Sequence, residues 1–290
     1  LRGKKAAGGE IIAEGDVVSL FLSDETIRIM TSDAESGEEA FKNVDRGTDL
    51  RLIEADQDAA FFSKPAGLLT QPDRSGSKAA SDLIPGILIR EGILGEEDLR
   101  AFSPAPLNRL DRNTIGLIIA GTSMRGARLL SELIASRQLK KEYLVLTTGT
   151  PPEDGIYRAY AVKDTGRNYM RLYESRRQGA ADMVTGFQTL GKTDRGCLIK
   201  AELITGRTHQ IRAHLAYLGS PVAGDVKYGS REENARLRAL GVSRQMLHAF
   251  CVTFPKDTGP CPQLSGRSIV SDVPDDFRKL AHCMGLDHLI

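Results

Sequence analysis

The stretch 142–204 contains four segments that decide the class of fold: EYLVLTT at 142–148, IYRAYAV at 156–162, DMVTGFQTL at 182–190 and CLIKAELI at 197–204. β-branched and aromatic residues recur in each segment, which is typical of a β-strand. Successive strands follow one another here without the regular helical crossovers that a doubly wound parallel sheet requires. The stretch therefore predicts an α+β domain.

The segments around this stretch add strands and helices. LRLIEA at 50–55 and AAFFS at 59–63 flank a short polar turn and predict a hairpin, and GLIIAG at 116–121 predicts a buried strand. Ser123 is placed to cap a helix. Apolar residues recur at a spacing of three and four along that helix, at Met124, Ala127, Leu130, Leu133 and Ile134. Further helices are predicted at 208–218, at 232–240 and near 276–284.

Length and composition bound the possibilities. A chain of 290 residues, of which 41% are hydrophobic, can bury a core in one large domain or two smaller ones. It contains no apolar run of the roughly 18 to 20 residues that a membrane helix needs. The four cysteines form no Cys-x-x-Cys pair, so free thiols in a reducing cytoplasm are expected. Leu1 stands where an initiator Met is usual, which predicts a missing natural N-terminus.

Charge divides the chain into a small head and a large body. Residues 31–50 hold two Lys or Arg against six Asp or Glu. The acidic segment 31–48 is therefore predicted to be a linker. It separates a head at 1–30, which is too short to fold alone, from a body at 49–290. The body carries a mild positive excess, which by itself does not indicate a nucleic-acid partner.

Several familiar kinds of site are disfavoured. There is no phosphate loop ending in Gly-Lys-Ser/Thr, no Gly-x-Gly-x-x-Gly after a strand and no Gly-x-Ser-x-Gly elbow. His209 and His214 are five residues apart on a predicted helix, which angles them away from each other. A nucleotide cofactor, a serine nucleophile and a metal site are therefore not expected.

Three further segments are polar where a fold alone does not require it. Asp111 lies between Arg109 and Arg112 directly before an apolar strand, so neighbouring cations favour its charged form. Tyr143 begins another strand, and Arg212 lies on a helix that follows a Gly turn. Each residue also has a purely structural explanation. Asp111 would then form a surface ion pair, Tyr143 would be a core aromatic and Arg212 would be a surface charge.

Taken together, the motifs resemble those of the RluA-type pseudouridine synthases. In chain order they are KPAG at 64–67, RLDR at 109–112 with Thr114 and Gly116, KEY at 141–143, GRTHQIRAHL at 206–215 and GSPVAGDVKYG at 219–229. The resemblance covers about residues 50–255, and chance assembly of the long final motif is implausible. The head resembles the C-terminal part of the alpha-L RNA-binding domain often found ahead of this catalytic domain.

The resemblance implies roles for individual residues. Asp111 corresponds to the aspartate that attacks the nucleoside, and Arg212 to the arginine that pairs with it. Tyr143 corresponds to the aromatic that stacks on the uracil and is proposed as general base, and Arg109 to the arginine that fills the space of the flipped base. The residues expected to bind RNA are Arg109, Arg112, Lys141, Arg207 and His209. The chain departs from the family at Asn108, Asn113 and Ile115, which affects RNA positioning more than chemistry.

One carboxylate suffices for the implied reaction. Isomerising uridine breaks the N-glycosidic bond and rejoins the uracil through carbon to the same ribose, so no water need be activated. Attack by Asp111 on the ribose and attack on the uracil ring both stay open. A base inside a duplex cannot reach Asp111, so base flipping is expected.

We therefore expect a cytoplasmic pseudouridine synthase built on a mixed, mainly antiparallel sheet flanked by helices, without cofactor or metal. Its expected partner is RNA, with ribosomal RNA preferred over transfer RNA, and neither a membrane nor an obligate protein partner is expected. The alternative is a non-catalytic RNA-binding protein with a degenerate synthase cleft. A metal hydrolase using His209 and His214 is a distant third.

Overall fold

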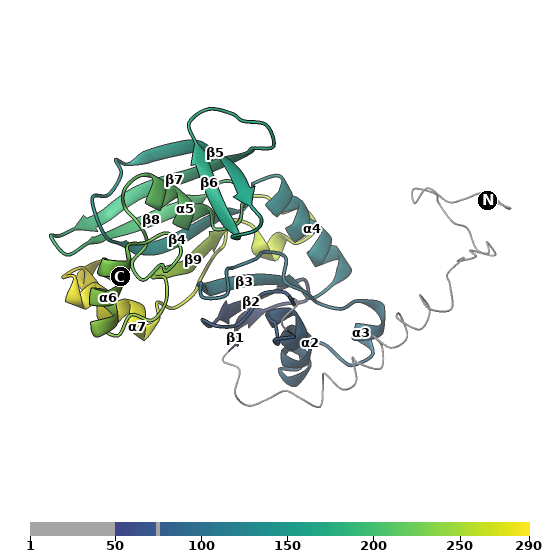
Figure 1. The fold of residues 1–290 in the computed structure, drawn as a ribbon. Helices are drawn as coiled ribbons and strands as arrows, with labels where there is room; N and C mark the ends of the chain where they lie inside the picture. Colours follow the sequence, from purple (N-terminus) through teal and green to yellow (C-terminus); the bar gives the residue numbers. More distant parts are fainter. Residues whose placement is uncertain (1–49, 74–75) are drawn as a thin grey trace. The chain divides into compact units, whose positions relative to one another are not determined.

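The computed structural model describes residues 50–73 and 76–290, which form one mixed sheet with helices packed on it (Figure 1). The predicted partial RNA-binding domain at 1–30 and the predicted linker at 31–48 lie outside the described residues. Within these two ranges, no helix combines the length and the apolar character needed to cross a bilayer.

The sheet follows the order β1-β2-β3-β9-β4-β8-β7-β5-β6, with β10 paired to β9. Only β3 and β9 pair in parallel among these neighbours. This confirms the predicted α+β class and the mixed, mainly antiparallel sheet. The strands are β1 (Arg51–Ala55), β2 (Ala59–Lys64), β3 (Ile115–Gly121), β4 (Lys140–Thr147), β5 (Gly155–Asp164), β6 (Tyr169–Tyr173), β7 (Ala181–Lys192), β8 (Cys197–Leu203), β9 (Leu247–Thr253) and β10 (Ser268–Val270).

Helices cover both faces of the central strands, as the alternation along β4 shows. Val145 belongs to a buried cluster that includes Ile211, whereas Leu144 belongs to a second cluster that includes Phe277. Because successive side chains of a strand point to opposite faces, α5 and α7 pack on opposite sides of β4. The helices are α2 (Ala80–Arg90), α3 (Asp98–Ala101), α4 (Met124–Ala135), α5 (Gln210–Tyr217), α6 (Arg231–Ala239) and α7 (Asp275–Cys283), with short 3₁₀ turns η1 (Pro262–Leu264) and η2 (Asp287–Leu289).

β9 joins two parts of the sheet that are separate in the chain. It lies between β3 and β4 (Figure 1), pairing in parallel with β3 and antiparallel with β4. Gly116 on β3 lies opposite Ala249 on β9 and has a φ of 111°. A Cβ at position 116 would collide with the backbone of Ala249. This glycine is therefore required both by its backbone angle and by the close approach of β9.

The structure corrects parts of the helix predictions. α5 begins at Gln210, two residues later than predicted, and its N-cap is His209 in a left-handed conformation. Met124 was assigned to the apolar face of α4 but is 64% exposed, although Ser123 does cap that helix by accepting from the Gly126 N–H. The structure also contains elements that were not predicted, among them α2, which contains Pro85, and the strands β6 and β9.

Gly116→Ala is expected to destabilise the protein by at least about 2 kcal/mol, because alanine suits neither the φ nor the space. Urea unfolding followed by circular dichroism measures the loss. Gly155→Ala is the matched control, since a Cβ there meets nothing within 4 Å. Equal stability of both variants with the parent would contradict the close approach of β9.

Candidate active site

Asp111 lies in a tight turn directly before β3. The Thr114 N–H donates to the Asp111 carbonyl at 3.0 Å and closes the turn. One residue earlier, Leu110 exchanges two hydrogen bonds with the Thr70 hydroxyl, at 2.9 and 3.1 Å. The Asp111 side chain is 27% exposed, so its carboxylate is fixed by the loop yet reachable from solvent.

Lys64 holds this loop through hydrogen bonds to its backbone. Its side chain is fully buried, and Nζ donates to the carbonyl oxygens of Pro65, Leu68 and Arg112 at 2.8, 2.8 and 2.9 Å. Burial lowers the pKa of Lys64 to about 7, while the nearby Asp111 carboxylate acts in the opposite direction. Lys64 therefore ties the KPAG turn to the residue that follows Asp111.

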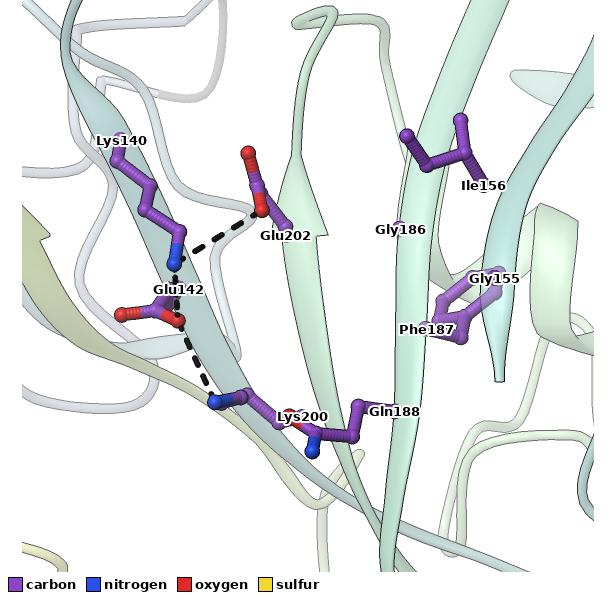
Figure 2. Close-up of a pocket in the computed structure, with 9 residues that line it drawn as sticks. All are labelled: Lys140, Glu142, Gly155, Ile156, Gly186, Phe187, Gln188, Lys200 and Glu202. Atoms are coloured by element: carbon purple, nitrogen blue, oxygen red, sulfur yellow. Dashed lines mark ion pairs between the residues drawn. The ribbon is translucent and has the colours of Figure 1, made fainter.

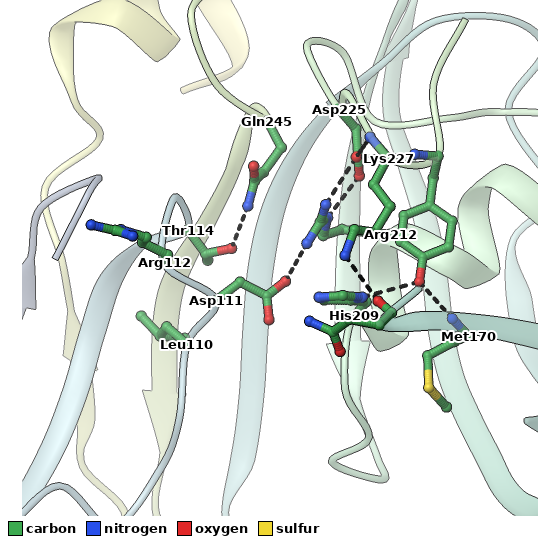
Figure 3. Close-up of polar contacts among 12 residues, drawn as sticks. Leu110, Asp111, Arg112, Thr114, Met170, His209, Arg212, Asp225, Lys227 and Gln245 are labelled. Atoms are coloured by element: carbon green, nitrogen blue, oxygen red, sulfur yellow. Dashed lines mark hydrogen bonds and ion pairs between the residues drawn. The ribbon is translucent and has the colours of Figure 1, made fainter. Parts of the chain in front are cut away.

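Arg212, on α5, lies between two carboxylates (Figure 3). Its Nη1 donates to Asp111 at 2.7 Å, while Nε and Nη2 donate to the two oxygens of Asp225 at 2.7 and 2.9 Å. Burial acts to lower the pKa of Arg212, but Asp225 and Asp111 together raise it above its ordinary value. The guanidinium is a permanent cation, and its planar fork orients the Asp111 carboxylate.

Asp225 is a fully buried carboxylate whose hydrogen bonds are satisfied. Besides Arg212, it accepts the backbone N–H groups of Lys227 and Tyr228 at 2.8 and 3.1 Å. Burial acts to raise the pKa of Asp225, but Arg212 and these N–H groups outweigh it and lower the pKa. Asp225 thus stays ionised and neutralises much of the charge that Arg212 brings into the site.

Tyr143 is the aromatic component of the site. It lies on β4, is buried, and has its pKa raised by burial and by the Asp111 carboxylate. The phenol therefore keeps its proton at neutral pH. This supports a stacking surface for Tyr143 and does not favour an ionised tyrosine as the base.

The other predicted residues occupy different surroundings. Arg109 is exposed, Arg112 donates from Nε to the Gly67 carbonyl at 3.0 Å, and Arg207 donates from Nε to the Asp182 carbonyl at 3.2 Å. Lys141 is half-buried on β4, and burial lowers its pKa. The predicted residues that the structure gathers around the Asp111 carboxylate are Tyr143, His209 and Arg212.

Sequence reasoning did not assign roles to several residues of the site. Asp225 and Tyr228 stand in the motif at 219–229, whose carboxylate and hydroxyl were the available signal. No sequence pattern pointed to Gln245. Its side-chain amide nevertheless donates to the Thr114 hydroxyl at 3.3 Å, at the end of the Asp111 turn. The neighbouring Arg244 forms a double hydrogen bond with Asp276 on α7, at 2.7 and 2.8 Å.

A separate hollow of about 230 Å³ is lined by residues of β4, β5, β7 and β8, among them Glu142, the residue before Tyr143 (Figure 2). Lys140 and Lys200 both pair with Glu142 there, at 3.0 and 3.6 Å, and Lys140 also approaches Glu202 at 3.9 Å. Gly186 adds no side chain to the floor of the hollow. The lysines and glutamates of this hollow pair with one another. The Asp111 carboxylate lies elsewhere and is partly exposed to solvent.

The site combines a reachable carboxylate in a turn before β3, the buried arginine on α5 that orients it and an aromatic ring on β4. The family described as RNA pseudouridylate synthase matches residues 58–217. The chain belongs to this RNA pseudouridylate synthase family, which confirms the resemblance found in the sequence.

Named relatives and a solved structure agree with this assignment. The chain is 30% identical to the ribosomal large subunit pseudouridine synthase C of Haemophilus ducreyi, over 70% of this chain and 63% of the relative. It is 32% identical to the tRNA pseudouridine synthase C of the same organism, over 71% of this chain and 85% of the relative. Human RNA pseudouridylate synthase domain containing 4 shares the fold, with a TM-score of 0.65 and 23% identity over 87% of this chain and 98% of that chain.

The match to the ribosomal relatives is partial in length. Three proteins named ribosomal large subunit pseudouridine synthase C are covered over 63%, 51% and 45% of their own length. The chain therefore corresponds to about half to two thirds of these relatives.

Lys64→Met is expected to lower the free energy of unfolding by at least about 3 kcal/mol, because three buried carbonyls lose their donor. Urea titration at pH 7 measures this change. Lys279→Met, at an exposed position of α7, is the control and should unfold like the parent. A Lys64→Met protein as stable as this control would show that the three hydrogen bonds do not hold the loop.

Asp225→Asn is expected to cost about 3 to 5 kcal/mol at pH 7, because it leaves a buried cation short of its partner. The pKa of Asp225 lies below the ordinary value of 3.8, so its stabilisation is present above pH 3.8 and is lost as the pH falls through the lower folded value. The difference between parent and variant should therefore be large at pH 7 and pH 5 and shrink below pH 3.8. Urea titrations at these pH values test the trend, and the exposed Asp194→Asn should show no such difference.

Proposed function

We propose that this protein isomerises uridine to pseudouridine in RNA, with Asp111 as the nucleophile. The observation that carries the proposal is the 2.7 Å ion pair between the partly exposed Asp111 and the buried Arg212. Arg212 is itself held by Asp225, so the Asp111 carboxylate is oriented before substrate arrives.

The arrangement of carboxylates supports isomerisation over hydrolysis. A hydrolytic glycosidase uses two carboxyl groups, one of which manages water or the leaving group. The second carboxylate here, Asp225, is fully buried and engaged by Arg212 and two backbone N–H groups. It is therefore not free to act on water, which leaves Asp111 as the reactive carboxylate.

The bond changes balance without a cofactor. The bond from uracil nitrogen 1 to ribose carbon 1′ breaks, a bond from uracil carbon 5 to the same ribose carbon forms, and the proton leaving carbon 5 is replaced by one on nitrogen 1. Asp111 forms a transient bond either to the ribose or to the uracil ring, and both routes use its ionised form. Tyr143, whose phenol keeps its proton, supplies an aromatic ring on which the uracil stacks. Base stacking of this kind contributes about 1 to 3 kcal/mol to binding.

The surroundings of the site support an RNA substrate. A target base must leave its stack to reach Asp111, and the exposed Arg109, two residues away, is placed to fill the gap. Arg112, Lys141 and Arg207 supply positive charge for phosphates. Arg171 on β6 adds a further positive charge. Arg177 follows β6 in the chain, and its guanidinium lies 4.0 Å from the centre of the Tyr173 ring.

We propose ribosomal RNA as the substrate class, in the cytoplasm. The support is that several similar proteins are named ribosomal large subunit pseudouridine synthases. Transfer RNA is the second candidate, because another relative is named a tRNA pseudouridine synthase. Residues 1–30 are proposed to contribute to RNA binding as a partial alpha-L domain.

Release of tritium from RNA labelled at uracil carbon 5 tests the reaction, using total RNA from cells that lack pseudouridine synthases. The parent should release tritium, and Asp111→Asn should lose at least about a thousandfold in rate because it removes the nucleophile. Filter binding should show that Asp111→Asn still binds the RNA. Asp194→Asn, at an exposed position, should keep the parent rate.

Two results would contradict the proposal. Tritium release by Asp111→Asn at the parent rate would exclude Asp111 as the nucleophile. Tight RNA binding without release by the parent, on both ribosomal and transfer RNA, would favour the non-catalytic RNA-binding protein.

A further inference from the structure

His209 is held in a backbone conformation that its side chain rarely adopts. Its φ and ψ are 50° and 23°, and the other described non-glycine residues with positive φ are Arg137 and Asn168. The His209 side chain makes no capping hydrogen bond to α5, although the residue occupies the N-cap position. The conformation is disfavoured for a residue with a Cβ, so the surrounding structure must hold it in place.

The hydroxyl of Tyr228 is the hydrogen-bond partner of one ring nitrogen of His209. Its hydroxyl oxygen lies 3.0 Å from His209 Nδ1 and already accepts the Met170 N–H at 2.9 Å. Within residues 50–73 and 76–290, no other acceptor takes the hydroxyl proton, so the hydroxyl donates it to Nδ1. By this assignment from the hydrogen-bond network, neutral His209 carries its proton on Nε2.

Tyr228 is connected to the ion pair of Asp111 and Arg212 through Asp225. Its ring stacks on Tyr169 with centroids 4.5 Å apart, and its backbone N–H donates to Asp225 at 3.1 Å. Asp225 is the carboxylate that holds Arg212. The position of the His209 ring is therefore set by the same buried group that sets the position of Arg212.

The second ring nitrogen of His209 points toward Asp111 (Figure 3). It has no hydrogen-bond partner among the described residues, while the ring is half-buried. Burial lowers the pKa of His209 to about 4; Asp111 and Asp225 oppose this shift, and Arg212 and Lys227 add to it. At neutral pH the site thus contains an uncharged N–H donor beside the nucleophile.

We propose that His209 Nε2–H donates a hydrogen bond to an uncharged oxygen of the target nucleotide, either a uracil carbonyl or the ribose 2′-hydroxyl. Tyr228 acts as a positioning residue that keeps the donor on Nε2. The inference rests on the proposed function and names the recognition that accompanies it. A phosphate is the less suitable acceptor for His209. The imidazole carries no charge, and the arginines of the site are charged donors that bind a phosphate more strongly.

A matched pair of substitutions tests the donor. The amide nitrogen of His209→Gln reaches the Nε2 position, whereas that of His209→Asn reaches only the Nδ1 position and asparagine tolerates the left-handed backbone. In the tritium-release assay, His209→Asn should lower kcat/KM by about tenfold, the effect of one uncharged hydrogen bond. His209→Gln should recover most of the loss, and His288→Asn, at an exposed position, should match the parent.

Tyr228→Phe tests the positioning. Long-range ¹H–¹⁵N spectra of the parent should show His209 with its proton on Nε2, and Tyr228→Phe should show a mixture of both tautomers. The spectra report on the histidine whether or not catalysis is observed. A proton on Nδ1 in the parent would overturn the inference.

The kinetic outcomes separate the inference from the proposed function. Parent-like kcat/KM in His209→Asn, with activity still abolished in Asp111→Asn, would overturn the inference alone. No release by the parent would instead overturn the proposed function and the inference with it. Once the modified uridine is mapped, a 2′-deoxyuridine substrate distinguishes the two acceptors: the ribose hydroxyl is the acceptor if His209→Asn no longer reduces the rate, and the uracil carbonyl if it still does.

Discussion

Arg212 is a buried cation that lies between two carboxylates, and the rest of the site is arranged around the need to compensate it. A charge buried without partners would be too costly to retain, so the fold supplies Asp225 in a fully buried position. Asp225 in turn receives backbone N–H groups from the loop that follows it, which fixes the loop and the Tyr228 ring. The third nitrogen of Arg212 is then left for Asp111, the partner that remains accessible. One compensated charge thus orients the Asp111 carboxylate, the Tyr228 ring and the His209 ring beside it.

Several strands and the position of Asp111 in the site were predictable because each depends on local pattern. β4, β5, β7 and β8 are short apolar segments next to one another in the chain, and Asp111 stands out between two arginines. β9 was missed because its pairing with β3 and β4 depends on residues more than a hundred positions away. The start of α5 was misplaced for a different reason. Its N-cap, His209, has a left-handed backbone and a ring that contacts Tyr228, and no helix-capping rule predicts this arrangement.

The C-terminal segment, for which the sequence provided no functional role, is part of the support of the site. Asp276 on α7 holds the buried Arg244, whose neighbour Gln245 reaches the Thr114 hydroxyl. Thr114 closes the Asp111 turn from the other end. The Asp111 turn is therefore held at two points: by Lys64 through the KPAG turn, and by Gln245, whose neighbour Arg244 pairs with α7. Neither connection is visible in a sequence pattern, because each joins elements that lie far apart in the chain.

The central position of β9 has a consequence for how the protein is made. Asp111 precedes β3, and Arg212 lies after β8, so the two members of the ion pair belong to parts of the sheet that β9 connects. During synthesis from the N-terminus, the strands on either side are completed before residue 253 has been added. Until then the chain lacks the strand that pairs with both β3 and β4 and so joins the two parts of the sheet. The order of translation thus delays the alignment of Asp111 with Arg212 until β9 has been added.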